Sequence, residues 1–312
     1  MTRTPPRVVM IADDGAPVIA PQELPLAGPP GADPATESGT SSAWRQTLER
    51  AMALAPLHQV YAVVDGRHDK WWRRTACPLP PHNIRRQPHG GSCAAVILLS
   101  LATILQTDPD ADILIMPSNQ RVRLEPILLD SLRLALDLLP RLDRRVVLLA
   151  TDPAFPDPRR DYVLPAASFI RDALPVDVVR FVAKPAASVA ERLISRGALW
   201  NTSILAARGS DLLRLFEHRI PELVGGLRPF LADRAGDAPQ FTARRALYRE
   251  LRNVSFAKDI LQAQPDSLKV LRVPACTWMD GLAVDRPAPR PGAHDFMAGG
   301  KKSGATLSTT AN

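Results

Sequence analysis

Short apolar runs that alternate with helix-type segments constrain this chain more than any other feature of its sequence. Four runs rich in Val, Ile, Leu and Ala are typical of buried strands: residues 7–12, 60–64, 111–116 and 145–150. Three segments between them are typical of helices: residues 41–52, 94–105 and 124–139. Such alternation favours a mostly parallel sheet with helices on both faces. The sequence therefore predicts an α/β fold with a mixed, mostly parallel sheet.

The second half of the chain is less regular, and both ends are rich in proline. Further elements are expected at residues 178–182, 188–195, 203–207, 211–261 and 268–273. The chain has 31 prolines in 312 residues, roughly twice the usual share, and they cluster in residues 16–40 and after residue 286. We expect one domain over residues 1–286, with an irregular loop at 16–40, and a disordered tail over 287–312.

Composition excludes several classes of protein. The net charge is +7 (Lys+Arg 39, Asp+Glu 32), which suits anionic partners such as nucleotides and sugar phosphates. The arginines form scattered pairs with no long basic run, so we expect no nucleic-acid partner. Three widely spaced cysteines without a Cys-x-x-Cys pair favour a reducing compartment. No leader-like N-terminus and no apolar stretch of about 18 residues occur, so we expect a cytoplasmic protein without a membrane partner.

Polar residues follow several of the expected strands, where ligands bind in sheets of this type. The candidates are Asp13 and Gly15, Gln87 and Gly90, Ser118 and Asn119, Lys184, Asn201 and Thr202, and Asp280. Each has an ordinary structural alternative, such as a turn, a helix cap or a solvated loop lysine. Trp200 and Trp278 are expected in the core rather than under a ligand. No Gly-x-Ser-x-Gly elbow or Walker lysine motif is present, which disfavours hydrolase and P-loop chemistry.

In order along the chain, these segments resemble motifs of the mannose-1-phosphate guanylyltransferases, which are sugar-nucleotide pyrophosphorylases. Residues 87–97 are similar to Glu-Pro-x-Gly-Arg-Asn-Thr-Ala-Pro-Ala-Ile, and residues 110–120 to Asp-Ala-x-x-x-x-x-Pro-Ser/Ala-Asp-His. Residues 181–185 resemble Phe-Val-Glu-Lys-Pro, residues 199–203 Leu-Trp-Asn-Ser-Gly, and residues 278–281 Trp-x-Asp-x-Gly. Residues 46–50 are similar to the family's Gln-x-Thr-x-x-Arg stretch. The resemblance covers about residues 42–285.

The resemblance implies a single Rossmann-like, glycosyltransferase-A-like nucleotidyltransferase domain. It also implies the reaction of GTP with mannose 1-phosphate to give GDP-mannose and pyrophosphate, with Mg²⁺. By the same resemblance, Gln87 and Gly90 face the guanine, and Asn119 takes the first metal position. The nucleotide set comprises Asp13, Gly15, Gln87, Gly90, Ser118 and Asn119, and the sugar set Tyr162, Lys184, Asn201 and Thr202. Lys184 and Asp280 take the catalytic positions, Lys184 at the sugar phosphate and Asp280 at the metal.

Several positions depart from the family pattern. The Gly-Gly-x-Gly-Thr-Arg phosphate loop is replaced by residues 13–17, which lack its arginine and the lysine that follows. Asn119 and Gln120 stand in place of Asp and His, and Ala183 in place of Glu. Loss of one charge-neutralising group typically slows a reaction about a hundredfold or more. Two hypotheses follow: a slow guanylyltransferase-like enzyme, or an inactive paralogue that binds a sugar nucleotide or regulates an active partner as a homo- or hetero-oligomer.

Overall fold

The computed structural model describes residues 4–11, 39–65, 78–87, 92–166, 174–232 and 248–280. For residues 39–42, 65, 227–232, 252, 279 and 280 it describes the backbone alone. The expected loop at 16–40 lies almost wholly outside these residues, and the expected tail lies wholly outside them.

Four parallel strands form the first part of a nine-stranded sheet. They are β1 (Arg7–Ile11), β2 (Val60–Asp65), β3 (Ile84–Gln87) and β4 (Asp112–Pro117), in the spatial order β3-β2-β1-β4. This order is that of a nucleotide-binding half of a doubly wound sheet, as expected from the alternating pattern. Their carboxyl ends therefore meet at one edge of the sheet.

The other five strands depart from an open Rossmann-like sheet. β9 (Leu199–Arg208) lies antiparallel between β4 and β6 (Val146–Thr151), and β10 (Leu268–Arg272) follows β6 in parallel. β8 (Val176–Val182) is antiparallel to β10 and to β7 (Tyr162–Pro165), and β7 also pairs with β9. The five strands β9, β6, β10, β8 and β7 thus close on themselves. The expectation of a mixed sheet is confirmed, whereas the Rossmann-like description holds only for the first four strands.

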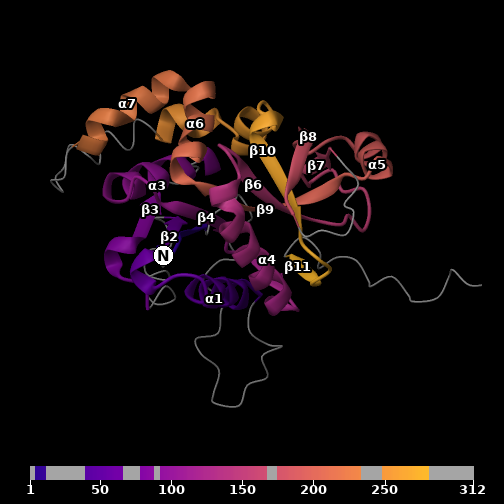
Figure 1. The fold of residues 1–312 in the computed structure, drawn as a ribbon, viewed down its shortest axis with the longest axis horizontal. Coiled ribbons are helices and arrows are strands. Elements are labelled where there is room, and N and C mark those ends of the chain that lie inside the picture. Colours follow the sequence, from indigo (N-terminus) through magenta and orange to yellow (C-terminus); the bar gives the residue numbers. More distant parts are fainter. Residues whose placement is uncertain are drawn as a thin grey trace, which may run out of the picture. The chain divides into compact units, whose positions relative to one another are not determined.

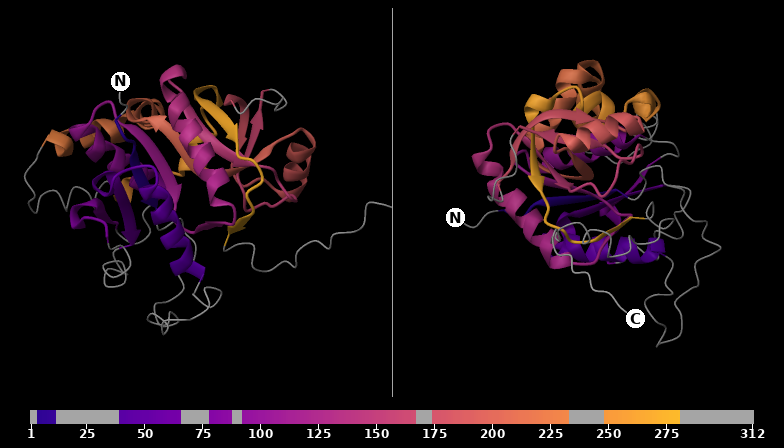
Figure 2. Two further views of the ribbon diagram at one scale, coloured as in Figure 1. Left: turned by 60° about the horizontal axis from the view of Figure 1, so that its bottom comes forward. Right: turned by 90° about the vertical axis from the view of Figure 1, so that its right-hand side faces the viewer.

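Helices cover both faces of the sheet (Figure 1). α1 (Gly39–Met52) and α4 (Glu125–Leu138) share one apolar cluster with the sheet. α3 (Cys93–Thr107) and α6 (Gly209–Arg219) belong to a second cluster on the opposite face, where α7 (Pro221–Ala232) also packs. Figure 2 shows these two layers of helices with the sheet between them. Because both faces are covered, β1, β2, β4 and β6 are buried along most of their length, as their continuous apolar runs predict.

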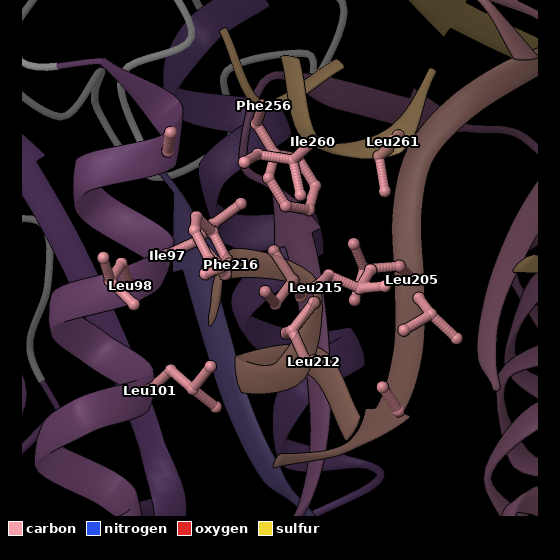
Figure 3. Packing of buried hydrophobic residues seen from close by; sticks show 14 of the residues in the cluster. Ile97, Leu98, Leu101, Leu205, Leu212, Leu215, Phe216, Phe256, Ile260 and Leu261 are labelled. Atoms are coloured by element: carbon pink, nitrogen blue, oxygen red, sulfur yellow. The ribbon is translucent and has the colours of Figure 1, made fainter. Parts of the chain in front are cut away.

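A π-helical turn completes the second apolar cluster (Figure 3). Residues Phe256–Leu261 form this turn, and Phe256 stacks on Phe216 of α6 with the ring centroids 5.6 Å apart. Ile260 is fully buried beside them. Each such apolar side chain contributes about 1.5–3 kcal/mol on burial, so this turn is held firmly to α6.

Smaller elements surround the closed five-strand unit. α5 (Ala187–Ser195) packs on β7, and β5 (Gln120–Val122) pairs antiparallel with β11 (Trp278–Asp280). Short 3-10 turns occupy Leu57–Gln59, Pro81–Asn83, Leu139–Arg141, Leu251–Asn253 and Pro265–Ser267. No helix among the described residues is long and apolar enough to cross a membrane.

Most expected elements are found close to their predicted bounds. Of the helices expected over 211–261, α6 and α7 are found, residues 233–247 lie outside the described residues, and Leu251–Asn253 and Phe256–Leu261 form 3-10 and π turns. The strands β3, β5, β7 and β11 are not among the expected elements, and β9 begins at Leu199, four residues before its expected start. Ser203 interrupts β9 with a φ of 60°, close to an irregularity in its pairing with β6. The left-handed backbone at Ser203 breaks the regular strand geometry, and the sequence pattern indicated a strand only from this residue onward.

Candidate functional site

Three segments of the closed five-strand unit meet at the residue that precedes β7. Tyr162 pairs with Trp200 of β9 and with Val182 of β8, so Asp161 lies between the segments that follow. The Asn201 N–H donates to the Asp161 carbonyl over 2.9 Å, and the Lys184 N–H donates to Asp161 Oδ1 over 3.2 Å. Asp161, Lys184 and Asn201 are called the edge cluster below.

Asp161 is the centre of this cluster electrostatically. Burial raises the pKa of its carboxyl group above the ordinary value of 3.8. The Lys184 charge and N–H, a hydrogen bond from Asn201 and the Arg160 charge oppose that rise in pKa. The carboxyl group is therefore surrounded by donors and cations, and it binds the Lys184 backbone N–H and the Asn201 side chain.

Asn201 is 7% exposed and carries an unused acceptor. Its side chain hydrogen-bonds to Asp161, while its Oδ1 atom is buried and has no hydrogen-bond partner among the described residues. A buried acceptor without a donor costs about 1–3 kcal/mol. A hydroxyl group supplied by a ligand would remove that cost.

Aromatic rings and a second cation border the edge cluster. The Arg160 guanidinium lies 5.3 Å from the centroid of the Trp200 ring, and Phe155 meets the same ring edge-to-face at 5.2 Å. Trp200 is half-buried rather than fully in the core. This cation–π contact holds Arg160 beside Asp161.

Two residues of the expected sugar set have structural roles instead. Tyr162 is fully buried, and its hydroxyl group accepts from the Asp157 N–H over 2.8 Å and lies 3.1 Å from the Asp157 carbonyl. The expectation that Tyr162 faces a sugar is corrected, because its ring is core and its hydroxyl closes a turn. The Thr202 hydroxyl donates to the Leu149 carbonyl over 2.7 Å, which ties β9 to β6.

The expected nucleotide positions adjoin the edge cluster through Gln120. Its Nε2 atom donates to the Thr202 carbonyl over 2.6 Å, and its backbone pairs with Asp280 across β5 and β11. Ser118 is buried, and its N–H donates to the Ile11 carbonyl at the end of β1. Asn119 is half-buried between Ser118 and Gln120. The structure thus brings residues 118–120 and the backbone of Asp280 next to Asn201–Thr202.

Other expected site residues are not brought into this group. Gln87 ends β3 and is buried at the same edge of the sheet, but β2 and β1 separate it from β4. Asp13, Gly15 and Gly90 lie outside the described residues. The base-binding and phosphate-loop expectations therefore remain predictions.

Two contacts that sequence reasoning missed link α1 to its neighbours, Gln46 to β5 and Arg50 to α4. Gln46 of α1 donates to the Val122 carbonyl over 2.7 Å and accepts from the Val122 N–H over 3.0 Å. Arg50, one turn further along α1, binds both carboxylate oxygens of Glu125, with Nε 3.0 Å from Oε2. The resemblance of residues 46–50 to a family motif was the one sign in the sequence that these residues matter. The contacts of Gln46 and Arg50 show what the motif does in the fold.

The expected metal ligand Asp280 is described by its backbone alone, so the expectation of Mg²⁺ remains a prediction. Among the described side chains, no group of three His, Cys, Asp or Glu is arranged to hold a metal ion. Asn119 and Gln120 carry no charge, and Mg²⁺ in proteins usually keeps at least one carboxylate.

A cavity of about 380 Å³ lies at the opposite edge of the sheet, where β4 begins and β9 ends. It is lined by Thr4, Pro5, Asp108, Asp110, Ala111, Asp112, Pro140, Arg208 and Ser210. Asp108 is already paired with Arg7 over 3.1 Å. The cavity is thus separate from the edge cluster and holds mostly like charges.

The fold and the edge cluster together define a mixed α/β protein with a polar site beside a closed five-strand unit. A structure described as mannose-1-phosphate geranyltransferase from Thermus thermophilus is similar, with a TM-score of 0.67 and 21% identity over 88% of this chain and 75% of that chain. Another, described as mannose-6-phosphate isomerase from Helicobacter pylori, has a TM-score of 0.64 and 16% identity over 88% of this chain and 100% of that chain. Neither a family model nor a curated protein matches the sequence. At these identities the likeness shows a shared fold.

Proposed function

We propose that this chain is a mannose-1-phosphate guanylyltransferase-like protein whose edge cluster binds mannose 1-phosphate or the mannosyl phosphate end of GDP-mannose. The observation that carries the proposal is the junction of Asp161, Lys184 and Asn201, with one buried acceptor of Asn201 unused. The family resemblance of the segments around Lys184 and Asn201 supports the same assignment. So does the fold shared with two structures whose descriptions name mannose phosphates.

The chemistry of the cluster suits a phosphorylated sugar. Lys184 is exposed and offers a point charge with three donors to a phosphate group. Asp161 and Asn201 offer acceptors to ring hydroxyls, and Asp161 also limits the net positive charge beside the phosphate. A sugar without a phosphate would leave Lys184 unused, and inorganic phosphate would leave Asn201 unused.

In the transferase reaction, a phosphate oxygen of mannose 1-phosphate attacks the α-phosphorus of GTP as the bond to the β-phosphate oxygen breaks. Pyrophosphate leaves and GDP-mannose forms. On this proposal Lys184 orients the attacking phosphate in line, which converts a bimolecular encounter into a positioned one. We expect slow turnover, because Asn119 and Gln120 supply no charge at the nucleotide side.

A second candidate is binding without turnover. It is favoured by Gln120, whose amide is committed to the Thr202 carbonyl and which stands where the family has a histidine. Such a protein would sense GDP-mannose or regulate an active partner. The two candidates share the sugar-phosphate site and differ only in whether pyrophosphate is released.

Calorimetric titration with mannose 1-phosphate, GDP-mannose and GTP, each with and without Mg²⁺, tests the proposal. The wild type should bind mannose 1-phosphate, and Lys184→Met should weaken that binding at least tenfold, as expected for loss of a charged hydrogen bond. Lys258→Met is the matched control, since Lys258 is another exposed lysine outside the cluster. Absence of binding by all three ligands would refute the proposal. Pyrophosphate release from GTP separates the enzyme from the binding protein.

A further inference from the structure

The backbone at Lys184 is strained and is held by side chains from two distant segments. Lys184 has a φ of 42°, in the left-handed region that residues other than glycine rarely adopt. The Lys184 side chain is exposed, so its packing does not impose this conformation. Strain of this kind persists only where neighbouring groups determine the backbone.

Two hydrogen bonds hold the backbone at Lys184 in this conformation. The Lys184 N–H donates to Asp161 Oδ1 over 3.2 Å, and the preceding N–H, that of Ala183, donates to Gln262 Oε1 over 2.8 Å. Asp161 comes from the segment before β7, whereas Gln262 comes from the turn before β10. The N–H groups of Ala183 and Lys184 are therefore bound by side chains from two different segments.

The π-helical turn places Gln262. The Gln262 N–H donates to the Ala257 carbonyl five residues back, over 2.9 Å, so the chain is wound wider than an α-helix at this point. Phe256, Ile260 and Leu261 fix the turn in the apolar cluster against α6 (Figure 3). A turn anchored in the apolar core thus brings the exposed Gln262 side chain to the backbone of Ala183.

We propose that Gln262 is a positioning residue that sets the direction of the Lys184 ammonium group toward the bound phosphate. The proposal rests on the proposed function, in which Lys184 binds that phosphate. Gln262 itself does not touch the ligand. The family that this chain resembles has a glutamate at the position of Ala183, whose methyl group cannot bind a sugar hydroxyl. Affinity therefore depends on the position of the Lys184 ammonium group.

The test compares Gln262→Leu with Gln264→Leu in the full chain. Gln264 follows in the same segment, and its Nε2 atom donates to the Leu215 and Ile260 carbonyls over 3.0 and 3.1 Å, without contact to the Lys184 turn. Mannose 1-phosphate is titrated by calorimetry, and amide hydrogen exchange of Ala183 is followed by NMR. Gln262→Leu should weaken binding about threefold to tenfold, as expected for one lost hydrogen bond that positions a charge, and should speed the Ala183 exchange.

Gln264→Leu should lower the melting temperature and leave both the affinity and the Ala183 exchange unchanged. Gln262→Glu keeps an acceptor for the Ala183 N–H and should restore slow exchange. Wild-type affinity in Gln262→Leu, or equal weakening in both leucine variants, would overturn the positioning role while leaving the proposed function intact. Failure of the wild type itself to bind mannose 1-phosphate would overturn both.

Discussion

Replacement of Glu125 by leucine tests the buried ion pair that joins α1 to α4. The Arg50 side chain is fully buried, and its guanidinium meets both oxygens of the Glu125 carboxylate, whose side chain is 23% exposed. Removing one partner of a buried ion pair typically costs about 3–5 kcal/mol, because the other charge stays buried alone. Since water reaches part of Glu125, we expect the lower end of that range, about 3 kcal/mol.

The double variant Arg50→Met/Glu125→Leu removes both charges and should lose only about 1–2 kcal/mol, less than Glu125→Leu alone, because no buried charge is left without a partner. Urea unfolding followed by circular dichroism measures both variants. Asp130→Ala is the control, because the Asp130–Arg133 pair is exposed and should contribute less than about 0.5 kcal/mol. If Glu125→Leu costs no more than Asp130→Ala, the argument from the buried pair is refuted.

Three further changes have defined expectations. Ser203→Gly should stabilise the chain by about 0.5–1 kcal/mol in urea unfolding, because glycine adopts the φ of 60° without strain; a destabilised variant would contradict this. Tyr162→Phe should destabilise by about 1–3 kcal/mol, since the Asp157 N–H loses its buried acceptor; unchanged stability would show that water replaces the hydroxyl. The pKa of Asp161 is raised in the folded state, so its contribution to stability should be present at low pH and be lost as pH rises above 3.8 through the folded pKa. The unfolding free energy of the wild type minus that of Asp161→Asn should fall as pH rises. A rise of this difference with pH would contradict the raised pKa.

The sequence predicted the parts of the fold in which one local pattern decides the structure. The buried strands β1, β2, β4 and β6 are continuous apolar runs, and burial on both faces is the only arrangement that suits them. β3 was missed because Ile-Arg-Arg-Gln is an edge strand, where charged residues are common. Closure of five strands was missed because it depends on β7 pairing with two partners, which no local pattern records.

The structure shows where some of the expected site residues lie, and their binding roles remain predictions. Lys184 and Asn201 were expected at strand ends near a sugar phosphate, and the structure places both beside Asp161. Asp161 was not singled out, because its importance comes from the strand closure around it. Tyr162 was assigned to the sugar by resemblance, and the structure shows a core ring whose hydroxyl closes the Asp157 turn.

The measurement that tests the central claim most directly is a titration of the isotope-labelled wild type with mannose 1-phosphate, followed by amide shifts in NMR spectra. Saturable shifts should concentrate at Asp161, Lys184 and Asn201, with little change at the cavity around Asp108 and Arg208. Shifts confined to that cavity, or none at a saturating ligand concentration, would contradict the account.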